Sequence, residues 1–236
     1  MNRAPGTVRI LSWNIHGALG RNPRFDLDRV VTLIDRWAPD IVALQEVDSR
    51  REKDLRVNPF AFLQQKLGEH GIGAKSITTD DGDYGQMLIS RWPMTDTVIH
   101  DLSYPEREPR RAIAAAIETP DGPLRLVATH LGLSIHERRS QTKTLLDIAG
   151  QGLSTTVIAG DFNDWFWVGS VRRALSCALP GCTRFRTFPS IFPLLRLDRI
   201  FCRPADALVH AFTDRAARHV SDHLPVIADV RVAPSA

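Results

Sequence analysis

Short apolar runs separated by turn residues recur along the whole chain, and this pattern predicts many short β-strands. The runs that we interpret as buried strands are residues 8–13, 41–44, 112–118, 124–129, 156–159, 197–202, 207–212 and 225–232. Three or four further short strands are expected between residues 74 and 102. Residues 120–123, with the sequence Pro-Asp-Gly-Pro, lie between two of the runs and predict a hairpin turn.

Other segments carry apolar residues at helical spacing. The first lies between Leu27 and Trp37 and is stopped by Pro39. The other predicted helices are residues 59–70, closed by Gly71, residues 134–149 and residues 168–175. Strands interrupted at irregular intervals by helices predict an α+β fold, in which two packed mixed β-sheets are flanked by helices.

The length and composition are those of one globular domain with a sizeable core. The chain has 236 residues, of which 43% are hydrophobic and 24% are charged. We therefore expect a single domain over residues 1–236, with short flexible ends at residues 1–6 and 233–236. The formal net charge of +3 suits a polyanionic partner, but it is too small an excess to argue for one.

The three cysteines, Cys177, Cys182 and Cys202, form no CxxC pair, and their odd number argues against a disulfide framework or a thiolate zinc site. We expect reduced thiols, and hence a cytoplasmic protein. Residues 1–9 contain no apolar signal-peptide core, and no apolar stretch approaches the ~20 residues of a membrane span. We expect a monomer without a transmembrane segment, for which peripheral membrane contact stays open.

Polar residues stand at the ends of the apolar runs, where a core alone would not require them. Each one is ordinary by itself, because an isolated Asn, Asp or His near a strand end is commonly a turn, cap or structural residue. Their recurrence at six strand ends predicts instead that they converge at one rim of the sheets. These residues are Asn14, Glu46, His130, Asp161 with Asn163, Asp198, and Asp222 with His223.

Six short motifs around these residues resemble, in the same order, those of the endonuclease/exonuclease/phosphatase family. They are Ser-Trp-Asn-Ile-His-Gly (12–17), Leu-Gln-Glu-Val (44–47), Thr-His-Leu-Gly (129–132), Gly-Asp-Phe-Asn-Asp (160–164), Leu-Asp-Arg-Ile (197–200) and Ser-Asp-His-Leu-Pro (221–225). Residues 84–93 are similar to a further family strand, with Gln86 where Asn is more usual. Each motif alone is weak, but the ordered set is specific and spans nearly the whole chain. The resemblance implies a four-layer α/β/β/α sandwich that hydrolyses phosphate esters.

The resemblance also implies a bound Mg²⁺ ion, for which Mn²⁺ could substitute. Such a hard cation takes oxygen ligands and keeps several waters, so one or two protein groups suffice. Glu46 is the main expected ligand, and Asn14 supplies an amide oxygen or orients Glu46. Asp222 is expected to help position the metal. The sequence contains no cluster of His and Cys that suits zinc.

The remaining motif residues are expected to act on the attacking water and the phosphate. Asp161 would orient and deprotonate the water, with Asn163 fixing that water or a phosphate oxygen. His223 would donate to a non-bridging oxygen while Asp198 holds its ring, and which of Asp161 and His223 is the formal base stays open. His130 would be a second phosphate contact or a leaving-group acid.

Two neighbouring groups allow a functional and an ordinary structural interpretation. Arg107 or Arg110 could clamp a phosphate with paired donors, or both could belong to a solvated basic turn. Residues 165–167, Trp-Phe-Trp, could form an apolar wall beside the phosphate or a membrane-touching lip, or could pack a helix against the sheets. His16 lies inside a motif but receives no role.

The expected function is Mg²⁺-dependent hydrolysis of a small or lipid-linked phosphate ester by a phosphodiesterase or phosphatase. Thr-His-Leu-Gly at 129–132 and Arg-Leu-Asp-Arg-Ile-Phe at 196–201 are more similar to sphingomyelinase, inositol-phosphatase and bacterial phosphoesterase branches than to abasic-site endonucleases. The basic residues are scattered among acidic ones, so nucleic acid is a possible but not a favoured partner. The alternative is a Mg²⁺-dependent endonuclease or deoxyribonuclease. A non-catalytic scaffold is disfavoured because every candidate side chain is present.

Overall fold

Two mixed six-stranded β-sheets lie face to face in the computed structural model, which describes residues 3–19, 26–50, 58–150, 153–165 and 169–233. The first sheet has the strand order β11 (Leu208–Thr213), β12 (Val226–Val230), β1 (Val8–Asn14), β2 (Ile41–Asp48), β4 (Gly82–Ser90), β3 (His70–Thr79). The second sheet has the order β5 (Met94–Asp101), β6 (Arg111–Thr119), β7 (Gly122–His130), β8 (Thr155–Asp161), β10 (Asp198–Arg203), β9 (Gly181–Cys182).

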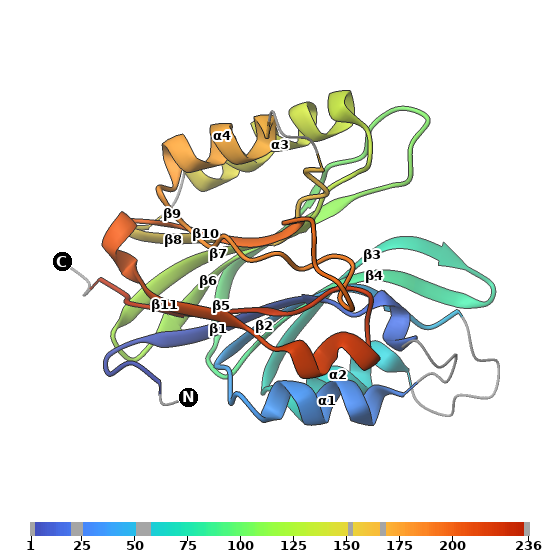
Figure 1. The fold of residues 1–236 in the computed structure, drawn as a ribbon, viewed down its shortest axis with the longest axis horizontal. Helices are drawn as coiled ribbons and strands as arrows, with labels where there is room; N and C mark the ends of the chain where they lie inside the picture. Colours follow the sequence, from blue (N-terminus) through green and yellow to red (C-terminus); the bar gives the residue numbers. More distant parts are fainter. Residues whose placement is uncertain (1–2, 20–25, 51–57, 151–152, 166–168, 234–236) are drawn as a thin grey trace.

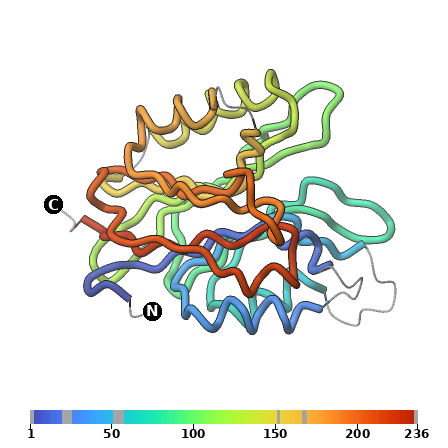
Figure 2. Tube along the Cα trace, viewed as in Figure 1, coloured from blue at the N-terminus to red at the C-terminus, as the bar shows by residue number. Residues whose placement is uncertain are grey.

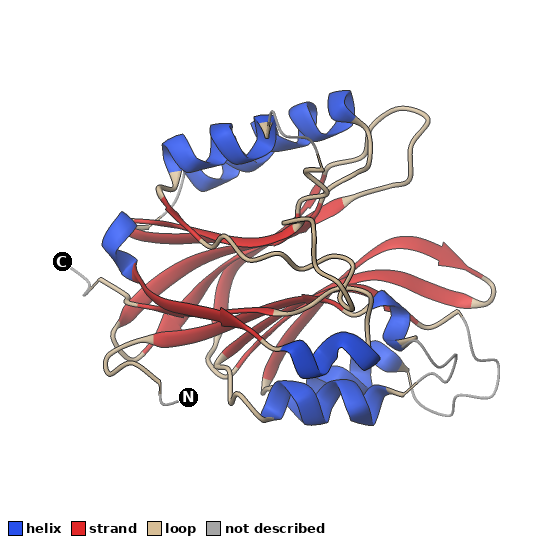
Figure 3. Ribbon diagram, in the orientation of Figure 1, coloured by secondary structure: helices blue, strands red, loops and turns tan. Residues whose placement is uncertain are grey.

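Helices cover the outer face of each sheet, as Figures 1 and 3 show. Helices α1 (Leu27–Asp35) and α2 (Pro59–Leu67) lie against the first sheet, and α3 (Ile135–Gly150) and α4 (Ser170–Ala178) lie against the second. Short 3₁₀ helices are formed by His16–Ala18, Ala205–Ala207 and Arg215–His219. The predicted α+β architecture of two packed mixed sheets flanked by helices is therefore confirmed.

The core has three apolar layers, because both faces of the central strands are buried. In β1, Val8 and Ile10 point between the sheets, whereas Leu11 and Trp13 point toward the helices of the first sheet. Strands buried on both faces read as continuous apolar runs rather than as alternating patterns. This double burial is the physical reason that short apolar runs located the strands in the sequence.

Strand direction brings the polar strand ends to one rim. Strands β1 and β2 are parallel, as are β7 and β8, so the carboxyl ends of each pair lie together. Strand β10 runs antiparallel to β8, and β12 runs antiparallel to β1, so their amino ends reach the same rim. The residues that end the first four strands and precede the other two are thus neighbours in space.

The second predicted helix is shorter than expected. It ends at Leu67 instead of continuing to His70, and Gly71 does not close it, because both residues belong to β3. A Cβ atom at Gly71 would lie 2.6 Å from the side chain of Gln64. Glycine at this position therefore allows β3 to pass close to α2, which is a packing requirement and not a helix stop.

The first strand β1 pairs with the last strand β12 in the first sheet (Figure 2). Of the residues expected to be flexible, Arg3 forms an ion pair with Asp40 at 2.7 Å, and the Ala4 amide donates to Asp229 at 3.3 Å. Residues 1–2 and 234–236 lie outside the described residues. Among the described helices, none has the length and apolarity needed to cross a membrane.

Candidate active site

Most of the predicted site residues meet where the rims of the two sheets adjoin. The first sheet contributes Asn14 and Glu46, and the second contributes His130, Asp161 and Asp198. Two hydrogen bonds join the sheets at this point: Asn14 Nδ2 donates to Asp161 Oδ2 at 3.1 Å, and His223 Nδ1 lies 2.8 Å from Asp198 Oδ2. The convergence inferred from the strand ends is present in the structure.

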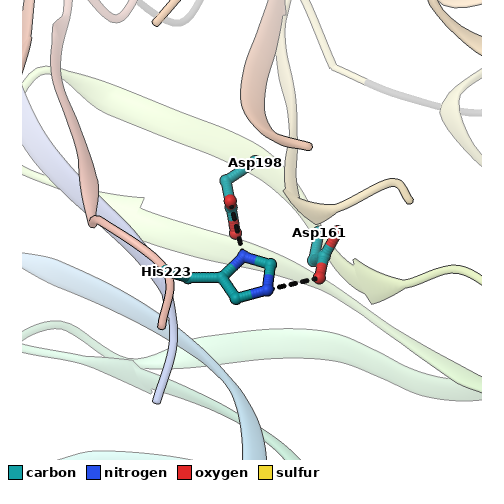
Figure 4. Close-up of side chains that lie close together, drawn as sticks. All are labelled: Asp161, Asp198 and His223. Carbon is teal, nitrogen blue, oxygen red and sulfur yellow. Dashed lines mark hydrogen bonds and ion pairs between the residues drawn. The ribbon is translucent and has the colours of Figure 1, made fainter. Parts of the chain in front are cut away.

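His223 is held between two carboxylates, as Figure 4 shows. Its Nδ1 faces Asp198, which is fully buried, and its Nε2 lies 3.8 Å from Asp161 Oδ2. Burial would lower the pKa of His223, but the negative charges of Asp198 and Asp161 raise it to about 10. His223 is therefore an imidazolium at neutral pH, with Nε2–H available as a donor.

Asp161 is a buried carboxylate at the end of β8. Burial, followed by the negative charge of Asp198, raises the pKa of Asp161 to about 6. Its Oδ1 accepts from the Asn163 amide at 2.9 Å, and its Oδ2 accepts from Asn14. A carboxylate with a pKa near the working pH, held in a fixed orientation, has the properties of a general base.

His130 also faces Asp161, and unlike His223 it is uncharged at neutral pH. Its Nδ1 is 3.1 Å from Arg110 Nη1, and its Nε2 is 3.6 Å from Asp161 Oδ2. Burial and then the positive charge of Arg110 lower the pKa of His130 to about 3. Asn163 Nδ2 also lies 3.3 Å from His130 Nε2, so two donors face a ring in which only one nitrogen can accept. Because Arg110 is nearer and is charged, we take Nδ1 as the acceptor, with the proton on Nε2, where it can donate to a phosphate oxygen but makes a poor acid.

The orientation of the Asn14 side chain is fixed by the backbone. Asn14 Oδ1 accepts from the amide of His16 at 3.0 Å, so the amino group must face the other way. Nδ2 donates to Glu46 Oε1 at 2.8 Å and to Asp161. Asn14 is thus hydrogen-bonded to the Glu46 carboxylate, and its amide oxygen keeps one further lone pair beside the His16 amide.

Glu46 lies inside β2 and not after it, at an interruption of the pairing with β4 between Leu44 and Val47. Its backbone has a φ of 56°, which is a strained left-handed conformation for a residue with a side chain. His16 and Asn163 share this feature, with φ of 48° and 49°. A bulge re-aims the side chain of a strand residue, and here it turns Glu46 toward the rim.

The environment of Glu46 keeps its carboxylate ionised. Burial would raise the pKa of Glu46, but hydrogen bonds from His16 and Asn14 and the nearby His130 lower it to about 2. His16, which lies inside a motif without a predicted role, has its Nδ1 3.5 Å from Glu46 Oε2 and 3.6 Å from Asp222 Oδ1. Two carboxylates from distant segments thus face one point, which identifies His16 as part of the site.

Oxygen donors of the kind that Mg²⁺ prefers stand at this part of the rim. Glu46 Oε2 and Asp222 Oδ1 are hard oxygen donors, and Asp222 is 42% exposed at its side chain, which leaves room for the waters that Mg²⁺ retains. Asp161, Asp198 and His223 also offer atoms within 4.8 Å of one another. Two groups of side chains at the rim could therefore hold a cation: Glu46 with Asp222, and Asp161 with Asp198 and His223.

The two arginines of the predicted phosphate clamp occupy different places. Arg110 is buried behind His130, and its Nη1 also lies 3.1 Å from Glu108 Oε1. Arg107 is exposed in the turn before β6, and its side chain has no hydrogen bond or ion pair with the described residues. The structure thus brings Arg110 to the site through His130, and it does not bring Arg107 there.

Aromatic rings line one side of the site. Phe188, which sequence reasoning missed, has its ring centroid 4.8 Å from that of His223 and 6.3 Å from that of Trp165. Trp165 is 44% exposed, so it belongs to the surface beside His223 and not to the packing of a helix. The other two members of the aromatic run, Phe166 and Trp167, lie outside the described residues.

Further apolar side chains are exposed around the same opening. Ile191, Phe192 and Leu194 lie on the loop that follows Phe188, and Phe192 is 71% exposed. Ile191 lines a cavity of about 240 Å³ together with His16 and Asp222. We name Trp165, Ile191, Phe192 and Leu194 the apolar lip.

Gly160 in the fourth motif is required by strand spacing. It has a φ of 155°, and a Cβ atom there would lie 1.9 Å from the carbonyl oxygen of Thr129 on the neighbouring strand. Only glycine permits this close approach of β7 and β8. The glycine therefore sets the separation of His130 and Asp161, which are paired in register at the strand ends.

Comparisons with known proteins agree with this architecture. The model of the Endonuclease/Exonuclease/phosphatase family matches residues 11–223. The uncharacterized protein YbhP of Escherichia coli strain K12 is 30% identical over 245 residues, covering 96% of this chain and 97% of that protein. The chain therefore belongs to the endonuclease/exonuclease/phosphatase family of hydrolases.

Solved structures share the fold at low identity. An endonuclease/exonuclease/phosphatase from Beutenbergia cavernae has a TM-score of 0.76 and 21% identity, covering 98% of this chain and 72% of that chain. A family protein from Leptotrichia buccalis has a TM-score of 0.75 and 18% identity, covering 95% and 100%. The 3′ phosphatase NExo from Neisseria, bound to a product DNA hairpin, has a TM-score of 0.68 and 22% identity, covering 94% and 99%.

Proposed function

We propose that this protein is a Mg²⁺-dependent phosphodiesterase or phosphatase that acts on a small or lipid-linked phosphate ester. The observation that carries the proposal is the pair of histidines around Asp161, of which one is a neutral imidazole and the other an imidazolium. His130 Nε2 and His223 Nε2 lie 3.6 and 3.8 Å from Asp161 Oδ2. These separations exceed a hydrogen bond, so the two N–H donors and the carboxylate are not bonded to one another and remain available to oxygens of a phosphate or a water.

The charge states of Asp161 and His223 support different roles for the two side chains in the hydrolysis. Asp161 accepts the proton of the attacking water as the oxygen–phosphorus bond forms and the ester bond breaks. His223 does not serve as the base, because its pKa of about 10 leaves it protonated. It donates instead from Nε2 to a non-bridging oxygen, where its positive charge stabilises the negative charge of the transition state.

The other residues hold these groups in place. Asp198 orients His223 through Nδ1, and Arg110 orients His130 in the same way. Asn163 is fixed by its Nδ2 bond to the carbonyl of Leu131 at 2.9 Å, beside His130 Nε2. Glu46 and Asp222 would hold Mg²⁺, which would supply neutralisation of phosphate charge when bound.

The apolar lip supports a substrate with an apolar part. Large apolar side chains exposed beside a polar site are a feature of surfaces that contact a ligand or a membrane. Trp165 and Phe188 connect the lip to His223 by ring contacts, so an ester oxygen at the phosphate site would place its organic group against them. A polar sugar–phosphate chain alone would gain little from this surface.

Hydrolysis of nucleic-acid phosphodiesters is the second candidate. The likeness to the Neisseria 3′ phosphatase, whose structure contains a DNA hairpin, favours it. One competition series separates the candidates: soluble aryl phosphodiesters, short-chain and long-chain lipid phosphate esters, plasmid and abasic duplex, at matched enzyme concentration and physiological salt. We expect turnover of small or lipid esters that EDTA abolishes and Mg²⁺ or Mn²⁺ restores.

Variants test the contribution of the lip. Phe192→Ala should lower kcat/KM for a long-chain lipid ester and leave that for a soluble aryl ester unchanged. The matched control is Ile99→Ala, which removes a side chain exposed to 47% on β5, at the edge of the second sheet. Full activity in EDTA, or rescue by Zn²⁺ alone, would refute the metal site, and efficient plasmid nicking without turnover of any small ester would establish the nuclease.

A further inference from the structure

Five arginines that are scattered in the sequence gather around two adjoining cavities beside the catalytic rim. The expectation that the basic residues do not assemble was wrong for this part of the surface. A cavity of about 260 Å³ and a cavity of about 310 Å³ share three of the arginines in their walls. The five are Arg172, Arg184, Arg186, Arg196 and Arg199, and we call this place the arginine cavity.

Arg199 forms the floor of the arginine cavity and is incompletely bonded. It is only 5% exposed, its Nη1 donates to the Thr183 carbonyl at 3.3 Å, and its Nε has no hydrogen-bond partner among the described residues. Burial lowers the pKa of Arg199, which reflects the cost of keeping a charge away from water. Its Nε–H therefore remains a donor that a phosphate oxygen could take.

The cavity walls do not neutralise this charge. Among the described residues, no carboxylate oxygen lies within the 4.0 Å ion-pair distance of any of the five guanidinium groups. The acidic residue in the lining is Asp164, whose Oδ2 already accepts from the backbone amide of Arg172 at 3.2 Å. Five like charges with one carboxylate nearby form an attractive field for a phosphate.

The arginine cavity adjoins the catalytic centre through two short connections. Arg199 follows Asp198 on β10, and because strand residues alternate, Asp198 points between the sheets while Arg199 points toward α4. Trp165 lines the larger cavity, and its ring contacts Phe188, which contacts His223. A ligand over this aromatic edge would reach both places.

We propose that the arginine cavity binds a second, non-scissile phosphate of the substrate, so that the preferred substrate is an ester carrying an additional phosphate group. The inference rests on the proposed function for the scissile phosphate. Arginine is suited to this because its planar donors pair with phosphate oxygens in a bidentate manner. The substrate thus spans the rim, with one phosphate between the histidines and the other over Arg199.

A single compact phosphate is favoured over a nucleic-acid backbone as the occupant. The arginines surround one buried guanidinium instead of forming an extended stripe, and Trp165 is the one aromatic ring in the described lining. Non-specific binding of a nucleic-acid strand uses a charged groove with successive stacking rings. Oligonucleotide binding is therefore an outcome of the test and not the proposal.

Direct binding tests the cavity without catalysis. Isothermal titration of the whole protein with inorganic phosphate, in EDTA, measures affinity, and titration of His223→Ala separates phosphate bound at the cavity from phosphate bound at the histidines. Arg184→Gln with Arg196→Gln should weaken the cavity's phosphate affinity roughly tenfold or more, as expected for lost charge-assisted hydrogen bonds. Both residues are exposed, so folding should survive.

The control is Arg173→Gln, which removes the same charge from α4 next to Arg172 but lies outside both cavity linings. Equal weakening by this control, or undiminished binding in the double variant, would overturn the proposal. Arg199→Met should also abolish the cavity binding, with its fold checked by circular dichroism.

A substrate pair then tests the link to the reaction. Two soluble esters that differ only in an additional phosphate are compared, and the double variant should lower kcat/KM for the doubly phosphorylated ester about tenfold while leaving the other unchanged. Arginine-dependent phosphate binding without hydrolysis of either ester would defeat the proposed function and keep the site. Hydrolysis with equal arginine dependence for both esters, or arginine-dependent binding of an oligonucleotide but not of phosphate, would defeat the inference.

Discussion

Arg110 Nη1 lies 3.1 Å from His130 Nδ1, and because a guanidinium can only donate, this contact holds the imidazole as the neutral tautomer with its proton on Nε2. We expect ¹⁵N NMR of the histidine ring to show an unprotonated Nδ1 at neutral pH. Arg110→Met should release this tautomer and lower turnover roughly 10- to 100-fold, the usual effect of losing a supporting partner. Arg111→Met, which breaks an ion pair with Asp101, is the control, and normal turnover of Arg110→Met would remove this positioning role.

The Asp161 and His223 side chains should each be essential for turnover. Asp161→Asn and His223→Ala are expected to lower kcat by roughly 10²- to 10⁴-fold without unfolding the protein, because they remove an acid–base group and a charge donor. Single-turnover kinetics on a soluble phosphodiester measure this effect. A folded Asp161→Asn variant with near-normal kcat would exclude Asp161 as the base.

Asp198 should act chiefly through His223, with which it shares a hydrogen bond. Asp198→Ala is expected to lower kcat in the same direction as His223→Ala, and the double variant should be little worse than His223→Ala alone, because the one hydrogen bond of this carboxylate to a group in the mechanism is lost in either case. The kcat values of the two single variants and the double variant form the required cycle. Additive losses would mean that Asp198 touches the reaction independently.

Removal of the Glu46 charge should raise the metal requirement. Glu46→Gln is expected to increase the Mg²⁺ concentration for half-maximal activity by at least roughly tenfold, since it replaces an ionised ligand with a neutral one. Asp222→Asn should have a smaller effect in the same direction, because this carboxylate is more exposed. An unchanged Mg²⁺ dependence in both variants would place the metal elsewhere.

Gly160 should tolerate no side chain. Gly160→Ala forces a Cβ atom into the Thr129 carbonyl oxygen, so we expect a loss of roughly 1–3 kcal/mol in the free energy of unfolding together with a loss of turnover. Gly150→Ala is a matched control at the end of α3, where a Cβ atom meets nothing within 4 Å. Urea unfolding compares them, and equal stability of the two variants would contradict the close-approach argument.

The buried pair of Arg9 and Asp229, with Arg9 Nε 2.7 Å from Asp229 Oδ1, should make stability depend on acid. Burial opposes ionisation, but hydrogen bonds from Arg9 and the Ala4 amide lower the pKa of Asp229 below its usual value. Because the pKa of Asp229 is lower in the folded protein than in the unfolded chain, its ionisation stabilises the fold. This stabilisation is complete above the unfolded-state pKa of about 4 and is lost as the pH falls through the folded-state pKa. Asp229→Asn should cost roughly 3–5 kcal/mol at pH 7 by leaving Arg9 buried and unpaired.

The measurement is the free energy of unfolding of Asp229→Asn against pH, with the exposed Asp147→Asn as control. The loss of stability below about pH 4 should be shallower in Asp229→Asn than in the natural chain, because one titrating group has been removed. An equal slope in both proteins would show that this pair does not contribute to acid unfolding.

The rim residues could be located from the sequence because each stands beside a buried apolar run. The direction of each strand in the sheet then determines which rim the residue reaches. The apolar run predicts that the strand ends before Glu46, whereas β2 continues past it. A bulge turns one side chain out of the sheet without changing the pattern of apolar residues, so the sequence does not reveal it. His16 had no recognisable role, because its partners, Glu46 and Asp222, come from segments far away in the chain.

The arginine cavity was beyond the reach of pattern reasoning for a related reason. Arg172 lies on α4, Arg184 follows β9, and Arg199 lies on β10, so they meet only when the helix packs on the sheet. The alternation of Asp198 and Arg199 on one strand would have shown that they face opposite sides. The alternation does not show which other residues lie on the side of the sheet that Arg199 faces.

The hydrogen bonds Asn14–Asp161 and Asp198–His223 each join one sheet to the other, so neither sheet forms the catalytic rim by itself. Turnover therefore depends on the position of one sheet relative to the other. As denaturant loosens the interior, the reactive geometry is lost while each sheet still keeps its own ladder of backbone bonds. Activity should therefore be lost at a lower denaturant concentration than the circular dichroism signal of the strands. A mutation between the sheets can also lower activity without touching a catalytic residue.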